Sequence, residues 1–196
     1  MSAVFIPSEP ALQDYWRALV MYGRNVASYK FALAKSLIEL KPDEGQLVKL
    51  EEIAPVFAKN ICEHLKLSDK QATSRSSRFL DYCRRYNKEE LGHNELVDKT
   101  ISLGFNNVID AFHILGNKSI NKQFYIDERN NHKGIKITTE FSELKNNPQF
   151  VNFEQEAESR WNLVETSWRL NISRSMLRVD CDESLNELVV YDGENK

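Results

Sequence analysis

The spacing of apolar residues between positions 10 and 40 constrains the fold of this chain more than any other feature. These residues recur every three or four positions, the period that places side chains on one face of an α-helix. Gly23 puts a small residue into this stripe, where two helices could cross closely, and Lys30 interrupts the stripe with a charge. The pattern predicts one long helix from Pro10 to about Leu40. Its predicted buried stripe is Trp16, Leu19, Val20, Gly23, Val26, Ala27, Lys30, Ala34, Leu37 and Ile38.

Further helices are predicted in the next third of the chain. A helix reaching about residue 66 should hold Pro55 in its first turn, where the missing proline N–H costs little. Residues 79–86 form another helix, and Asn94 should cap a third that runs to about residue 103. The polar stretch 68–77, which is rich in short side chains, is predicted to be a loop.

One strong amphipathic helix is predicted near the C-terminus, over residues 153–170. Two acid–base pairs spaced four apart, Glu156–Arg160 and Glu165–Arg169, should support it. One side of the helix carries Phe153, Ala157, Trp161, Val164 and Trp168. The two tryptophans follow the spacing of a buried stripe, which favours a place in the core over a stacking platform for nucleic-acid bases.

Short β segments flank this helix. Residues 124–141 alternate weakly around a polar turn at 130–134 and predict a β-hairpin, and residues 176–191 contain two short β-type runs. The predicted fold class is therefore mainly α: a multi-helix domain with small β-hairpin elements near residues 124–141 and 176–191. All 196 residues are expected to form a single domain with a small β appendage in its C-terminal part.

The overall charge gives no direct indication of a partner. The net charge is −3, with 41% hydrophobic and 28% charged residues, which is typical of a folded protein. Cys62, Cys83 and Cys181 are widely spaced and form no CxxC pair, a pattern that fits a reducing compartment. Neither a signal peptide nor a run of 18 apolar residues is present, so we expect a cytoplasmic protein with no membrane partner.

The stretch LGFNNVIDAFH, residues 103–113, has two interpretations. In the first, Gly104 ends one helix, Asn106 or Asn107 caps the next, and His113 lies near the C-terminus of that helix. In the second, Asn107 or His113 has a functional role. The spacing favours helix capping, and the functional interpretation stays open.

Motifs of known catalytic sites are missing from the sequence. It contains no glycine-rich phosphate loop, no GxSxG and no HExxH, and its four histidines stand apart from one another. We therefore predict no catalytic residue and no metal ligand.

The strongest local charge lies in residues 66–88, which hold seven bases and two acids, a net charge of +5. Arginine and lysine can contact phosphates along a nucleic-acid backbone, and serine, threonine and tyrosine can add hydrogen bonds. The alternative is a solvated helix face that pairs with Glu89 and Glu90. The predicted nucleic-acid-binding residues are Lys70, Arg75, Arg78, Arg84, Arg85 and Lys88.

Four distinctive segments occur in a fixed order: YWRALVMYGRNVASYKFALAKSLIEL, IAPVFAKNICEHLKLSDKQATSRSSRFLDYCRRYN, LGFNNVIDAFHILG and EAESRWNLVETSWRLNIS. Together they resemble the N-terminal region of bacterial proteins of the HNH endonuclease type, and the resemblance covers about residues 12–190. In such proteins a ββα-metal nuclease module follows this region. Its histidine cluster and flanking CxxC pairs do not occur here, so no catalytic residue can be carried over.

The resemblance implies a non-catalytic region that engages DNA or positions it for a nuclease, in bacterial defence against foreign DNA. A divalent metal is expected only for a following nuclease module, and no cofactor for this chain. The alternative function is a protein-interaction or dimerisation module, with a second copy or another protein as partner. The basic segment favours the first function, and the acidic C-terminal segment and net charge favour the second.

Overall fold

The computed structural model of this chain describes residues 9–23, 27–74, 76–173, 177–182 and 187–192. The α-helices are α1 Leu12–Arg17, α2 Tyr29–Leu40, α3 Leu50–Leu67, α4 Arg78–Asn87, α5 His93–Lys99, α6 Val108–Ala111, α7 Arg129–His132, α8 Thr139–Lys145 and α9 Phe153–Leu170. Two π-helical turns, η1 Ala18–Tyr22 and η2 Thr100–Gly104, and a 3-10 helix, η3 Pro148–Asn152, join them. The strands are β1 Leu47–Lys49, β2 Ile114–Leu115, β3 Lys118–Ser119, β4 Tyr125–Asp127, β5 Gly134–Ile137, β6 Leu177–Asp182 and β7 Glu187–Asp192.

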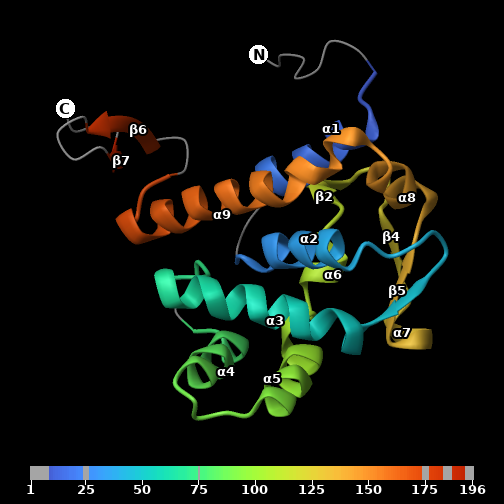
Figure 1. Ribbon diagram of the computed structural model, residues 1–196, viewed down its shortest axis with the longest axis horizontal. Coiled ribbons are helices and arrows are strands. Elements are labelled where there is room, and N and C mark those ends of the chain that lie inside the picture. Colours follow the sequence, from blue (N-terminus) through green and yellow to red (C-terminus); the bar gives the residue numbers. More distant parts are fainter. Residues whose placement is uncertain (1–8, 24–26, 75, 174–176, 183–186, 193–196) are drawn as a thin grey trace.

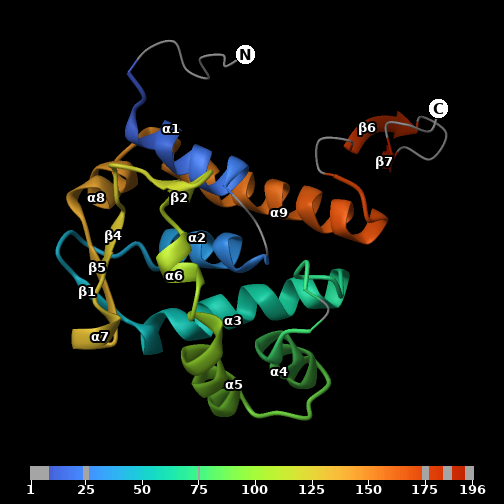
Figure 2. The ribbon, with the colours of Figure 1, turned by 180° about the vertical axis from the view of Figure 1, so that it is seen from behind.

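The long helices are stacked in layers, which Figure 1 shows from one side and Figure 2 from behind. Helix α9, with α1 beside it, lies on one side of α2, and α3 lies on the other side, followed by α4 and α5. Because α2 is the central layer, eight of its twelve residues are buried, and six of these eight are apolar. This position explains why its sequence is apolar on more than one face, unlike a surface helix.

In the described part of the chain, three small antiparallel sheets accompany the helices, and β2 and β3 form the smallest of them. Strand β5 lies between β1 and β4, with Val48 opposite Ile135 and Tyr125 opposite Ile137. Strands β6 and β7 form the second predicted hairpin, with Val179 opposite Val190. The predicted fold class, mainly α with small hairpins near residues 124–141 and 176–191, is confirmed.

The predicted long helix between residues 10 and 40 is wrong, because the chain breaks after η1 and resumes helical structure at α2. Gly23 follows η1 with an extended ψ of 153°. A Cβ atom on Gly23 would lie 2.3 Å from the carbonyl oxygen of Leu19 and 2.7 Å from Nζ of Lys30. Position 23 therefore requires glycine because the carbonyl oxygen of Leu19 and the ammonium group of Lys30 lie too close for a side chain. It is not a site where two long helices cross.

Two other predicted boundaries also shift. Helix α3 begins at Leu50, so Pro55 lies in its second turn and not in its first. Helix α5 begins at His93 after Gly92, so Asn94 does not cap it. Both helices start earlier than their sequence patterns suggest. Helix α3 begins directly after strand β1, and helix α5 begins directly after the turn that ends at Gly92.

Helix α9 matches its prediction at both ends, and both Trp161 and Trp168 are buried as expected. The predicted pair between Glu165 and Arg169 is wrong, because Glu165 is buried and its Oε1 lies 2.7 Å from Nδ1 of His64 on α3. A tertiary partner thus replaces the local one.

Candidate nucleic-acid interface

Helix α4 gives the basic segment its geometry. Its N-cap is Ser77, whose side chain accepts a hydrogen bond from the backbone N–H of Leu80 at 3.4 Å. One side of the helix is buried through Phe79, Leu80 and Cys83. Because residues three and four apart share a helix face, the burial of that side turns Arg78, Tyr82 and Arg85 together toward the outside.

Arg84 forms ion pairs with both acids of the segment. Its Nε lies 2.6 Å from Oδ1 of Asp69, its Nη1 lies 2.9 Å from Oδ1 of Asp81, and its Nη2 donates to the backbone oxygen of Asp69. These bonds hold the start of the loop between α3 and α4 against α4.

Tyr82 is the centre of a group of cations on the outer face of α4. The guanidinium carbon of Arg85 lies 5.5 Å from the centroid of the Tyr82 ring, and Nζ of Lys99, from α5, lies 5.2 Å from it. Arg78, Asp81, Tyr82 and Arg85 line a shallow hollow of about 240 Å³ on this face. Within the described part of the chain, none of Arg78, Arg85 and Lys99 forms an ion pair with a carboxylate.

The other predicted binding residues occupy different positions. Nζ of Lys70 donates to the backbone oxygen of Trp168 at 2.8 Å, where a positive charge is favourable at the C-terminal end of α9. Lys88 is exposed at the C-terminal end of α4. Arg75 lies outside the described residues. The structure therefore groups Arg78 and Arg85, adds Lys99, and commits Lys70 and Arg84 to contacts within the protein.

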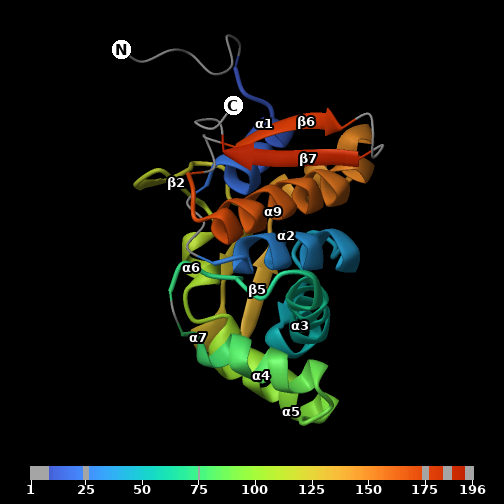
Figure 3. The same cartoon turned by 90° about the vertical axis from the view of Figure 1, so that its left-hand side faces the viewer.

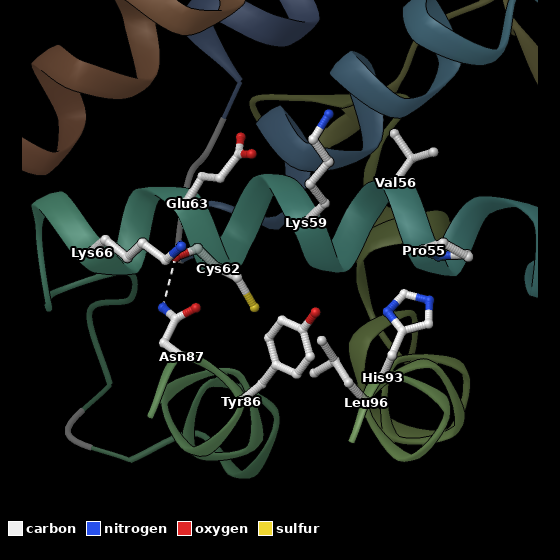
Figure 4. Close-up of a pocket in the computed structure, with 10 residues that line it drawn as sticks. All are labelled: Pro55, Val56, Lys59, Cys62, Glu63, Lys66, Tyr86, Asn87, His93 and Leu96. Atoms are coloured by element: carbon white, nitrogen blue, oxygen red, sulfur yellow. Dashed lines mark hydrogen bonds between the residues drawn. The ribbon is translucent and has the colours of Figure 1, made fainter. Parts of the chain in front are cut away.

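A cavity of about 420 Å³ lies between α3 on one side and α4 and α5 on the other. Figure 4 shows the side chains that line it. The rings of Tyr86 and His93 point into it, and Nδ2 of Asn87 donates to the backbone oxygen of Cys62 at 2.8 Å. Tyr82 and Tyr86 are four residues apart and so lie on adjacent parts of one side of α4, where Tyr82 lines the shallow hollow and Tyr86 lines this cavity. The residues that line the cavity are Pro55, Val56, Lys59, Cys62, Glu63, Lys66, Tyr86, Asn87, His93 and Leu96.

A buried polar cluster fixes the loop that leads into α4. The amide nitrogen of Gln71 donates to Glu165 and to the backbone oxygen of Ser68, and its oxygen accepts from Nε1 of Trp161 at 3.0 Å. The ring of His64 stacks on Trp161 with 3.5 Å between centroids. Every side chain of this cluster has partners, as buried polar groups need.

Lys35 and Glu158 extend this cluster toward the surface. Nζ of Lys35 lies 2.5 Å from Oε2 of Glu158, and Nε2 of His64 lies 3.2 Å from Oε1 of Glu158. Burial raises the pKa of Glu158, but the hydrogen bond from Lys35 and the charge of His64 outweigh it, so this pKa lies below its usual value. His64 is only 3% exposed, and both its ring nitrogens face carboxylates. This position on α3 suits a structural role, in which His64 helps to hold the loop that leads into α4.

The stretch LGFNNVIDAFH forms the end of η2 and the short helix α6. Asn107 occupies the N-cap position of α6, but its side chain makes no capping hydrogen bond. Gly104 serves packing, because a Cβ there would lie 3.3 Å from Cε1 of Phe57. Nε2 of His113 accepts a hydrogen bond from the backbone N–H of Phe124 at 3.0 Å. Burial, followed by the charge of Lys30, lowers the pKa of His113 to about 4, so the ring is a neutral structural acceptor.

Lys99 could not be found from the sequence, because it joins the group around Tyr82 only through the packing of α5 beside α4. Among the described residues, no three His, Cys, Asp or Glu side chains gather as metal ligands would. Within the same ranges, no helix has both the length and the apolar character that crossing a membrane requires.

Fold and site together define a mainly helical protein with a cationic, tyrosine-centred surface on one helix. In the comparisons, the chain matches no protein-family model, no curated protein and no solved structure.

Proposed function

We propose that this chain binds nucleic acid through backbone phosphates, using the outer face of α4 and Lys99. The observation that supports this function is the group of Arg78, Arg85 and Lys99 around Tyr82. An arginine fork can bond two phosphate oxygens at once, and the half-buried ring of Tyr82 can stack on an unpaired base through the part that is exposed. Arg78, Arg84, Arg85 and Lys99 carry four positive charges against the two negative charges of Asp69 and Asp81, so the net charge at this face is +2.

The biological role that we propose is to position DNA for an HNH-type metal-dependent nuclease module, in bacterial defence against foreign DNA. This part of the proposal rests on the resemblance of four sequence segments to the N-terminal regions of such proteins. We assign no catalytic residue and no cofactor to this chain.

Binding of a labelled DNA duplex and of the matching single strand, measured at several salt concentrations, tests the proposal. Replacing Arg78 and Arg85 together by alanine should weaken binding and lower the salt slope by about two, because each lost phosphate contact lowers it by about one. The matched control is Lys49→Ala with Lys136→Ala, which removes the same charge from exposed positions on the sheet of β1 and β5. No binding by the wild type, or an unchanged slope in the arginine variant, overturns the proposal.

A second candidate function is a protein-interaction or dimerisation module, and one exposed apolar residue favours it. Val151 in η3 is 81% exposed and borders a hollow of about 370 Å³ that Met21 and Leu163 also line. A contiguous apolar patch on a surface marks an interaction site, and Val151, Met21 and Leu163 meet at this hollow. The mass of the chain in solution, measured for wild type and Val151→Asp, separates this function from the first: a dimer that Val151→Asp dissociates would favour it.

A further inference from the structure

Lys30 in the first turn of α2 is a buried cation. Lys30 is 5% exposed, and its Nζ donates to the backbone oxygen of Ile114 at 3.3 Å. An ammonium group has three N–H donors, so this bond leaves donor capacity. In the described ranges no carboxylate pairs with Lys30. Burying an unpaired charge is costly, so such a residue needs a reason to persist.

The surrounding backbone makes room for this ammonium group. A Cβ on Gly23 would lie 2.7 Å from Nζ of Lys30, so any other residue at position 23 would press on it. The nearby His113 cannot act as a counter-ion, because it is neutral at physiological pH and would be positive if protonated. The protein therefore holds a positive charge at this point, and no acidic side chain among the residues that the structure describes balances it.

Lys30 lines a cavity of about 420 Å³ with hydrogen-bonding groups from three separate elements. Tyr29 and Lys30 come from α2, three serines come from the loop before α4, and Asn107 comes from the start of α6. Figure 3 shows that loop passing α2 and α6 on its way to α4. The apolar part of the wall consists of Ala27, Ala72, Val108 and Ala111.

The loop is held in place at this cavity by the backbone. Ala27 and Ala72 form an antiparallel bridge, and the N–H of Ser28 donates to the backbone oxygen of Gln71 at 3.0 Å. Gln71 is itself fixed by Trp161 and Glu165. The serines that follow Ala72 therefore lie against α2 in a defined position, as a binding site requires.

The hydroxyl groups of Tyr29 and Ser77 can together donate one hydrogen bond to a ligand. Their oxygens are 2.7 Å apart, and Ser77 Oγ also accepts from the N–H of Leu80. One of the two hydroxyl protons lies between the oxygens, so the other can be donated into the cavity. Burial raises the pKa of Tyr29 to about 12, which keeps this proton in place. Helix α4 starts directly after Ser77, and the positive end of its dipole adds to the field.

We propose that this cavity binds a phosphate monoester, with Lys30 as its counter-ion. Donors arranged on three elements suit the three terminal oxygens of a tetrahedral phosphate better than the two coplanar oxygens of a carboxylate. The alanine and valine side chains cover the organic group that carries the phosphate, and the volume falls in the range of small-molecule sites. A free nucleotide and the terminal phosphate of a nucleic-acid strand share this chemistry. The inference does not depend on the outer face of α4.

Calorimetric titration of the full chain with adenosine 5′-monophosphate tests this site, with adenosine as the ligand that lacks the phosphate. We expect the monophosphate to bind and adenosine not to bind. Lys30→Met should lower the affinity at least about tenfold, because a hydrogen bond to a charged group is lost. Asn107→Ala should lower it less. The control is Lys118→Met, an exposed lysine on β3 that should leave binding unchanged.

A second pair of ligands identifies the source of the phosphate. A short single strand with a 5′-phosphate is compared with the same strand ending in a 5′-hydroxyl. If the phosphorylated strand binds more tightly than both the hydroxyl strand and the mononucleotide, the natural ligand is a strand end; if the mononucleotide binds more tightly, it is a free nucleotide. Arg78→Ala with Arg85→Ala should leave mononucleotide binding intact, which separates this site from the outer face. Equal affinity for adenosine and its monophosphate, absence of binding by every phosphorylated ligand, or a Lys30→Met variant with wild-type affinity overturns the proposal.

Discussion

Two lysines of α2 lie in opposite electrostatic settings. Lys35 belongs to the buried cluster in which its ammonium group contacts Glu158, and Glu158 and Glu165 both contact His64. Lys30, five residues earlier, faces a cavity and has a backbone carbonyl as its partner. The first setting satisfies its charges internally and so stabilises the fold. The second leaves a charge to be satisfied from outside, which is how a binding site differs from a structural ion pair.

The largest expected effect comes from breaking the satisfied cluster. Glu165→Ala removes the partner of His64 and Gln71 and leaves both buried polar groups without it. We expect the free energy of unfolding to fall by about 3–5 kcal/mol. Urea denaturation measures this, and Glu154→Ala, on the exposed side of α9, is the control that should change stability by less than about 0.5 kcal/mol. A loss below about 1 kcal/mol for Glu165→Ala would show that the cluster does not stabilise the fold.

Removing the charge of Lys30 should instead raise the free energy of unfolding. Burial lowers the pKa of Lys30 from 10.5 to about 8, which corresponds to a destabilisation of about 3 kcal/mol at neutral pH. Lys30→Met should therefore raise the free energy of unfolding at pH 7, by up to that amount. Lys35→Met, which breaks an ion pair, should lower it. If both variants are destabilised alike, the contrast between the two lysines is wrong.

The pH dependence of this gain has a defined sign. The folded protein releases the Lys30 proton near pH 8, whereas the unfolded chain retains it up to its ordinary pKa of 10.5. The penalty in the wild type is thus fully present below pH 8 and disappears as the pH approaches 10.5. The advantage of Lys30→Met over the wild type, followed by thermal or urea unfolding, should shrink across this interval.

His113 gives a smaller effect at the acidic end. Its pKa is lowered from 6.5 to about 4, so the unfolded chain binds a proton between these values and the folded protein does not. Stability should fall as the pH drops below 6.5, by about 2 kcal/mol at pH 5. His113→Gln keeps an acceptor for the N–H of Phe124 and should remove this part of the slope. An unchanged slope in the variant would assign the acid sensitivity to other groups.

The sequence predicted the parts of the fold that local periodicity determines, and it missed those that depend on tertiary contacts. Helix α9 and the hairpin of β4 and β5 follow from spacing alone. The break at Gly23 does not, because it depends on the positions of Leu19 and Lys30 in space. Glu165 has a plausible local partner four residues later, and a histidine from α3 replaces that partner.

The candidate sites show the same division. Arg78 and Arg85 could be named from the local excess of bases, while Lys99 required the packing of α5 beside α4. Lys30 was visible as a charge in an apolar stripe. Its burial, its cavity and its lack of a carboxylate partner among the described residues depend on the packing of three separate chain segments.

The smallest effect on stability, and the sharpest test of the outer face of α4, comes from Asp69. This exposed acid pairs with Arg84 at 2.6 Å, and exposed ion pairs contribute about 0.2–1 kcal/mol, so Asp69→Asn should scarcely change the melting temperature. The substitution removes a negative charge from the cationic face and releases Arg84 from one partner. If nucleic acid binds there, affinity should rise and the salt slope should increase by up to about one, because a further cation can contact phosphate. Asp43→Asn, which breaks an equally exposed pair with Lys145 near the start of β1, changes the net charge identically and should leave binding as it was. Equal effects of the two substitutions would mean that only net charge matters, and the assignment of the outer face of α4 as the contact surface would fail.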